Sequence, residues 1–227
     1  MILGFVGTGK IASSVITGIC KSNLKYKKII ISPRNKQIAQ SLKKKFKKIV
    51  IAKNNQQIVD QSTWVFLSVT PTVGDKIIKD LKFKSTQTVV SFISTITLSQ
   101  LKKAIKVKAK VVRAIPLPPI SLKKGPVPIC PPNSKVKAFF NHLGTTVEIK
   151  NEKSSINFWS TSVITGISKS NTSYKKIIIS PRNKKIAQSL KRKFKKIVIA
   201  KDNQQIVDQS NWVFLSCLLY TSPSPRD

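Results

Sequence analysis

Short apolar runs alternate with segments of helical periodicity over the first 150 residues of the chain. The apolar runs are almost continuous and rich in β-branched residues, which is typical of parallel strands covered on both faces. The predicted strands are Ile2–Val6, Ile29–Ser32, Ile49–Ala52, Trp64–Val69, Thr88–Phe92 and Val111–Ile115. The predicted helices between them are Ile11–Lys21, Lys36–Phe46, Gln56–Gln61, Gly74–Leu81 and Leu98–Ile105. This alternation predicts an α/β fold with a Rossmann-like, doubly wound, mostly parallel sheet.

A proline-rich passage follows, from Arg113 to Asn133. We interpret it as a stiff loop bordering a cleft, because long ordered loops often border sites. A polyproline ligand for a partner protein is the alternative. A helix over Lys135–Leu143 and a last strand over Thr146–Ile149 then complete the pattern. His142 falls in the final turn of that helix, where a cation suits the helix dipole, and we assign it no catalytic or ligand role.

Residues 14–68 recur at 162–216 with 48 of 55 positions identical. The copy repeats the predicted strands 2, 3 and 4 but has no counterpart of the first strand or of the glycines that follow it. We therefore expect it to bind no cofactor. Since both copies fit the single first strand, they compete for it, and the directly connected copy has the lower loop-closure entropy cost. The other copy is then expected to expose apolar strands and aggregate, or to pack on an edge of the sheet.

The formal net charge of +34 raises the alternative of a non-catalytic basic module that binds nucleic acid or another polyanion. The basic residues are 37 Lys and only 5 Arg, whereas specific recognition of bases and phosphates relies on Arg. We therefore expect no specific nucleic-acid partner. The three cysteines lie far apart, so plain thiols are predicted rather than disulfides or a metal site. No segment reads as a signal peptide or membrane span, and we expect a cytoplasmic protein.

A glycine-rich turn, Gly7-Thr8-Gly9-Lys10-Ile11-Ala12, comes directly after the first predicted strand and opens the first helix. In a dinucleotide-binding turn the first glycine allows the tight bend and the second lets backbone N–H groups approach the pyrophosphate. The small Ala12 lets the helix pack close to the sheet, and the helix N-terminus favours the phosphate charge. This context predicts a dinucleotide site.

The second predicted strand ends at Ser32-Pro33-Arg34-Asn35, where an NAD-binding domain would carry an acidic residue for the ribose 2′-hydroxyl. No carboxylate is present there. Arg34 and the Ser32 hydroxyl are suited to a 2′-phosphate, so we expect NADP(H) in preference to NAD(H). A solvated arginine in a turn is the alternative interpretation.

The segments "GFVGTGKIA", "IISPRN", "NNQQIVDQSTWVFLSVTP", "SFISTIT" and "KAKVVRAIPLPP", in this order, resemble the N-terminal domain of pyrroline-5-carboxylate reductase. The likeness runs from Met1 to about Ile156. The resemblance implies an oxidoreductase that reduces 1-pyrroline-5-carboxylate to proline, the last step of proline biosynthesis, by direct hydride transfer from NADPH or NADH. Such chemistry needs positioning more than a strong acid or base, and we nominate no catalytic residue and no metal ligand.

The same resemblance implies the following cofactor contacts. The pyrophosphate would lie against Val6, Gly7, Thr8, Gly9, Lys10 and Ile11. The adenosine-ribose end would lie against Ser32, Arg34, Asn35 and Asn55. The nicotinamide half would lie against Ser68, Val69, Thr70, Pro71, Ser94 and Thr95.

Several positions depart from the family pattern on the nicotinamide and substrate side. Thr70 stands in place of a lysine, Thr95 in place of a glycine, and Leu117-Pro118 in place of Asn-Thr. These departures leave another cyclic imine open as the substrate.

The family continues with an all-helical domain that carries substrate contacts and the homo-oligomer interface, whereas this chain passes into the repeat. We expect the printed chain to be inactive alone for that reason. The tail "CLLYTSPSPRD" resembles a translated sequencing adapter, so our hypothesis is that the sequence from about residue 160 onward arises from sequence assembly; a tandem duplication is the alternative. The predicted organisation is an NADP-binding domain at 1–157, a junction at 158–161, a partial duplicate at 162–216 that is no independent domain, and a non-native tail at 217–227.

Overall fold

A computed structural model of the chain describes residues 1–150, 152, 164, 167–168, 173–182, 184–211 and 213. The described residues up to 152 belong to one unit, and those from 164 onward belong to a second unit. Each unit is described by itself.

The first unit alternates strands and helices along the chain. Its strands are β1 (Ile2–Val6), β2 (Lys28–Ile31), β3 (Ile49–Ile51), β4 (Trp64–Leu67), β5 (Thr88–Ser91), β6 (Lys110–Ala114), β7 (Pro126–Cys130) and β8 (Thr145–Glu148). Its helices are α1 (Lys10–Cys20), α2 (Lys36–Lys45), α3 (Asn55–Gln61), α4 (Pro71–Asp80), α5 (Leu98–Ile105) and α6 (Ser134–Asn141), with a 3₁₀ helix η1 (Pro118–Leu122). Helix α4 begins three residues earlier than its predicted start at Gly74, because Pro71 is well suited to the first helical position.

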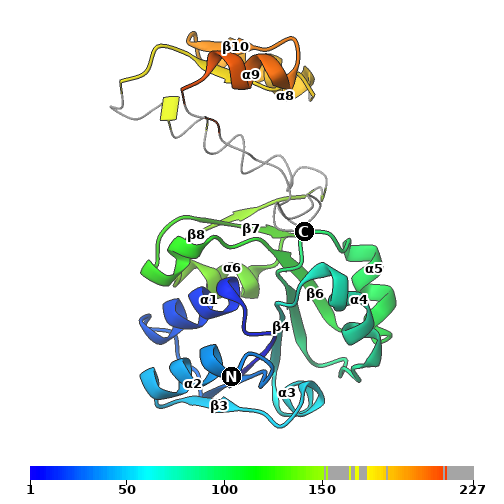
Figure 1. The fold of residues 1–227 in the computed structure, drawn as a ribbon. Helices are drawn as coiled ribbons and strands as arrows, with labels where there is room; N and C mark the ends of the chain where they lie inside the picture. The colour runs from blue at the N-terminus through cyan, green and yellow to red at the C-terminus, as the bar shows by residue number, and fades with distance from the viewer. Residues whose placement is uncertain are drawn as a thin grey trace. The chain divides into compact units, whose positions relative to one another are not determined.

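One eight-stranded sheet runs through this unit in the order β3-β2-β1-β4-β5-β6-β7-β8 (Figure 1). Neighbouring strands are parallel from β3 to β6 and again from β7 to β8, and only β6 and β7 pair antiparallel. The first six strands thus have the doubly wound order 3-2-1-4-5-6. The predicted Rossmann-like fold is confirmed for this unit.

Helices cover both faces of the sheet (Figure 1). Helices α1, α2 and α6 pack on one face, and α3, α4 and α5 on the other. Strand β2 shows why the apolar run is continuous: Ile29 and Ile31 are buried under the first layer, whereas Ile30 is buried under the second. Within the described residues, no helix is both long and apolar enough to cross a membrane.

The proline-rich passage is not the loop that its composition predicts. It forms η1 and then strand β7, which lies between β6 and β8. The carbonyl of Pro128 accepts from Ile115 N at 3.0 Å, whereas the carbonyl of Ile129 accepts from Ile149 N at 2.9 Å. Pro126 and Pro128 therefore face the β6 side, where the ladder has only two residue pairs. A strand with prolines is tolerated there because few N–H donors are needed on that side.

The second unit repeats the arrangement of β2, α2, β3 and α3. It contains β9 (Ile177–Ile179), α8 (Lys184–Lys193), β10 (Ile197–Ile199) and α9 (Asn203–Gln209), with β9 and β10 parallel. In the described part of this unit, no strand corresponds to β1. Of the expected counterpart of β4 at 212–215, only residue 213 is described, and the junction at 158–161 and the tail at 217–227 lie outside the described residues.

Candidate functional site

The predicted cofactor residues lie at one edge of the sheet in the first unit, after the carboxyl ends of β1 to β5 (Figure 1). The chain turns to opposite sides after β1 and β4, because β2 and β4 flank β1. In open α/β sheets this reversal of strand order leaves a crevice that binds ligands. The fold therefore brings the separate predicted segments to the location expected for a dinucleotide.

Gly7 is required by the backbone of this edge. Its φ is +98°, and a Cβ at this position would lie 2.3 Å from the carbonyl oxygen of Ser68. The Ser68 N–H donates to the Val6 carbonyl at 2.8 Å, so β1 and β4 are joined directly beside the turn. Any side chain at Gly7 would force the two strand ends apart.

Gly9 and Thr8 provide the test of whether an anionic cofactor fits. A Cβ at Gly9 would meet no atom within 4 Å, so the protein's own packing does not require glycine there. Gly9 is the N-cap of α1, and no side chain caps that helix end. The Thr8 hydroxyl is buried without a hydrogen-bond partner in the described part of the chain. Open space, uncapped N–H groups and an unused hydroxyl together fit a pyrophosphate group.

The remaining residues of the turn continue into α1. Lys10 is exposed and Ile11 is half-buried at its first two positions. Ala12 is fully buried against the sheet, in agreement with the small residue expected there.

At the end of β2, Ser32 is buried and its hydroxyl donates to Oδ1 of Asn55 at 2.9 Å. Asn35 caps α2 by accepting from Ile38 N at 3.2 Å. Arg34 is exposed between them. The Ser32 proton is thus engaged by Asn55. Of the two residues predicted to bind the 2′-phosphate, Arg34 is the exposed one and supplies the positive charge.

The predicted nicotinamide residues lie after β4 and β5. Ser68 and Val69 are half-buried, and Thr70 is the exposed N-cap of α4, which Pro71 begins. Ser94 and Thr95 are half-buried in the connection from β5 to α5. The β4–α4 and β5–α5 connections come close to each other beside Gly74 of α4. A Cβ at Gly74 would lie 3.2 Å from Ile93 and 3.4 Å from Val69.

Arg113 and Glu152 form an ion pair that the sequence did not predict. Arg113 is only 4% exposed, and its Nη1 donates to Glu152 Oε1. Its Nη2 donates to the carbonyl of Ser94 at 2.5 Å. A basic residue inside the apolar strand Lys110–Ala114 was the available signal, because a buried charge is retained only with partners.

Two of the three cysteines lie in the described residues. Cys20 is half-buried and Cys130 is buried, and both are free. Burial raises the pKa of the Cys130 thiol, Glu152 raises it further and Arg113 lowers it. Cys217 lies outside the described residues. In the described ranges, no three His, Cys, Asp or Glu side chains gather as a metal site requires.

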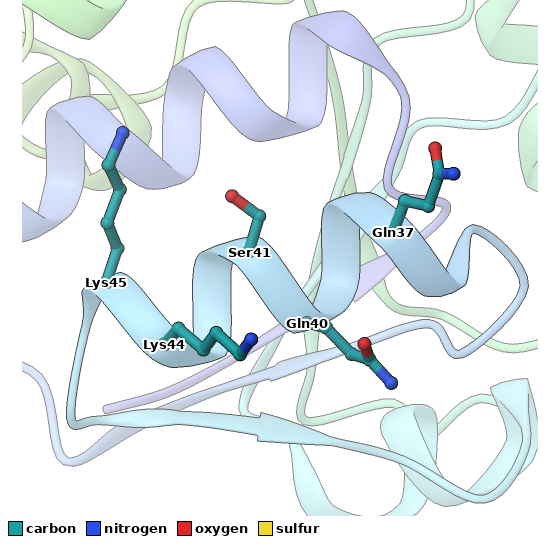
Figure 2. A pocket seen from close by; sticks show the side chains of 5 residues that line it. All are labelled: Gln37, Gln40, Ser41, Lys44 and Lys45. Carbon is teal, nitrogen blue, oxygen red and sulfur yellow. The ribbon is translucent and has the colours of Figure 1, made fainter.

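One hollow on the surface lies elsewhere, along α2 (Figure 2). It measures about 530 Å³ and is lined by Gln37, Gln40, Ser41, Lys44 and Lys45. All five side chains are exposed, and they form one stripe of the helix. None of the predicted cofactor residues lines it, and it is an open depression rather than an enclosed site. The dinucleotide site is therefore inferred from the strand ends and not from this hollow.

Comparison with known proteins indicates the class of protein to which the first unit is similar. Residues 2–95 match the protein family described as "NADP oxidoreductase coenzyme F420-dependent". No curated protein sequence matches the chain. The first unit thus carries, over residues 2–95, the NADP-binding domain of an oxidoreductase, and the NADP(H) preference expected from Arg34 agrees with this class.

Similar solved structures include pyrroline-5-carboxylate reductases. The enzyme from Streptococcus pyogenes is 21% identical with a TM-score of 0.56, over 76% of this chain and 72% of that one. Pyrroline carboxylate reductase from Plasmodium falciparum with NADP bound is 18% identical with a TM-score of 0.58, over 93% and 80%. A reductive aminase from Aspergillus terreus in complex with NADPH and ethyl levulinate is 12% identical with a TM-score of 0.58, over 73% and 60%. At these identities the likeness establishes the fold.

Proposed function

We propose that this chain is an NADP(H)-dependent reductase of a cyclic imine by descent, with 1-pyrroline-5-carboxylate as the substrate and proline as the product. The observation that carries the proposal is the glycine turn at the β1–β4 reversal, followed by Arg34 where an NAD-binding domain would carry a carboxylate. The ordered set of motifs that resembles pyrroline-5-carboxylate reductase supports the substrate. The fold of the S. pyogenes and P. falciparum enzymes agrees with it.

The residues of the first unit have binding and positioning roles in this proposal. The turn from Gly7 to Gly9 and the N-terminus of α1 hold the pyrophosphate, and Arg34 holds the 2′-phosphate. Ser68 to Pro71 and Ser94 to Thr95 border the nicotinamide. When bound, NADPH supplies the hydride that reduces the C=N bond. Positioning of a protonated imine beside the nicotinamide is the main demand on the protein.

A chimera tests whether residues 1–157 serve as the cofactor domain of such a reductase. Residues 1–157 are joined to the part of the S. pyogenes reductase that follows its cofactor domain, and NADPH oxidation is followed with 1-pyrroline-5-carboxylate. We expect turnover by the chimera and none by the printed chain, in which the repeat replaces the helical domain. NADPH binding by the chimera is measured first. A chimera that binds NADPH but does not reduce 1-pyrroline-5-carboxylate contradicts the proposed role of residues 1–157.

The Arg34→Ala substitution is expected to weaken NADPH binding by about tenfold or more while NADH binding stays unchanged, because only the 2′-phosphate loses its cationic partner. Fluorescence titration of the full chain with both cofactors measures this. The chain supplies its own matched control, because Arg182 follows the same Ser-Pro dipeptide in the second unit. Arg182→Ala should leave both affinities unchanged. A loss of NADPH affinity in the Arg182 variant contradicts the assignment of the cofactor to the first unit.

A further inference from the structure

The environment of Arg113 is unusual for a strand residue. β5 pairs Ser91 with Arg113, and β7 pairs Cys130 with it, so the arginine lies inside the sheet near the edge that carries the candidate site. A buried guanidinium is costly unless its donors are satisfied. Two of its nitrogens are, by Glu152 and by the Ser94 carbonyl, whereas its Nε has no partner in the described part of the chain.

Glu152 connects this arginine to the start of α5. The carboxylate oxygen that receives Arg113 also accepts from the Leu98 N–H at 2.9 Å. Leu98 is the first residue of α5, and Thr97 caps that helix with a complete capping box. The connection between β5 and α5 is therefore held at both ends: Arg113 binds the Ser94 carbonyl and Glu152 binds the Leu98 N–H.

The held segment contains Ser94 and Thr95, which border the nicotinamide in the proposed function. The Ser94 hydroxyl is buried and has no hydrogen-bond partner in the described residues. A buried hydroxyl without a partner costs free energy, which a bound polar group would recover. The carboxamide of the nicotinamide is a group of suitable chemistry, because it both donates and accepts hydrogen bonds.

We propose that Arg113 and Glu152 are a positioning pair that fixes the Ser94–Leu98 connection for the nicotinamide half of the cofactor, and that they act through this connection rather than by touching the adenosine half. The inference rests on the proposed function, since it requires a dinucleotide at the carboxyl ends of the strands. Binding of the nicotinamide half and binding of the adenosine half then depend on different residues.

Two ligands separate this claim from a general structural role. NADPH carries the nicotinamide, whereas 2′-phospho-ADP-ribose carries the same phosphates and adenosine but no nicotinamide. Dissociation constants for both are measured by calorimetry on the full chain, with Glu152→Gln as the first variant. Glutamine has the same shape and still accepts from Leu98, but it removes the charge that holds Arg113. We expect NADPH to bind about tenfold more weakly, which is the scale of one lost charge-assisted contact, and 2′-phospho-ADP-ribose to bind within about twofold of the original chain.

Arg113→Lys is the second variant. It keeps a cation beside Glu152, so we expect it to retain part of the NADPH affinity of the original chain. Glu148→Gln is the matched control, because it breaks the Lys137–Glu148 ion pair at a half-exposed position away from the connection. It should change neither constant. Thermal melts show whether each variant is folded, and a folded variant of either residue suffices for the test.

The outcomes distinguish the two proposals. Equal losses for both ligands in a folded variant show that the pair is only structural and overturn the positioning role, while the binding of NADPH by the original chain still stands. Unchanged NADPH affinity in a folded variant also overturns it. If the original chain binds neither ligand, the proposed function fails and this inference fails with it.

Discussion

The Gly9→Asp substitution is expected to abolish NADPH binding, by a factor of about 100 or more, while leaving the fold intact. A Cβ at Gly9 would meet no protein atom within 4 Å and the backbone there is in an ordinary extended conformation, so the native packing tolerates a side chain. A carboxylate at this place would lie where the pyrophosphate approaches the α1 N-terminus, and the two negative charges repel each other. Titration with NADPH and a thermal melt measure the two effects separately.

The Gly7→Ala substitution is the comparison for Gly9→Asp, because the native packing requires glycine at position 7 but not at position 9. At Gly7 a Cβ would lie 2.3 Å from the Ser68 carbonyl oxygen at a φ of +98°. The strained backbone and the overpacking should together cost about 2–4 kcal/mol of unfolding free energy. We therefore expect a clearly lower melting temperature for Gly7→Ala and an unchanged one for Gly9→Asp. If Gly9→Asp retains NADPH binding in a folded protein, the turn is not the phosphate site.

Ending the chain after residue 157 is expected to remove most of its tendency to aggregate. The second unit repeats residues 14–68 of the first unit, with 48 of 55 positions identical, but its described residues bury fewer of these side chains. Val59 is fully buried and its counterpart Val207 is 54% exposed; Val65 is fully buried and its counterpart Val213 is 43% exposed. In the first unit, β1 lies beside β2 and β4 and packs under α3. The copy has no β1 of its own among the described residues, so its apolar surface stays accessible.

Light scattering and the fluorescence of a dye that binds apolar surfaces compare the full chain with residues 1–157. We expect both signals to fall several-fold on truncation. Val207→Asp in the full chain is the matched control and should lower them partly, whereas Val59→Asp should unfold the first unit. Equal scattering from the full and truncated chains contradicts the account of the second copy. Amplifying the gene across the codons for Ser160–Val163 tests separately whether the repeat is encoded.

The sequence was sufficient for the parts of the fold that local patterns specify. The run Ile29-Ile30-Ile31 reads as a strand covered on both faces, and its residues are buried under both helix layers. Gly7 could be placed in the turn because the requirement for a positive φ is local. The strand order of the first six strands follows from the family of doubly wound sheets rather than from any single residue.

Other features depend on contacts between residues far apart in the sequence. Arg113 and Glu152 are 39 positions apart, and Ser32 and Asn55 are 23 apart. No periodicity reports such a pairing. Strand β7 was missed because its prolines argue against a strand between two others, and only the short ladder with β6 explains why they are tolerated. The sequence predicted residues for the candidate site, but it did not predict which of them contact one another.

The assignment of an NADP(H) site to the first unit is tested by titrating residues 1–157 with NADPH and with NADH. Random-sequence DNA is the third ligand, titrated over a range of salt concentrations. We predict that NADPH binds at least about tenfold more tightly than NADH, because Arg34 binds the 2′-phosphate. We also predict that NADPH displaces bound DNA only to the extent that its own charge screens the attraction between protein and DNA. Equal or absent binding of the two cofactors, together with a DNA affinity that falls steeply with salt, would contradict this assignment and favour a basic binding module.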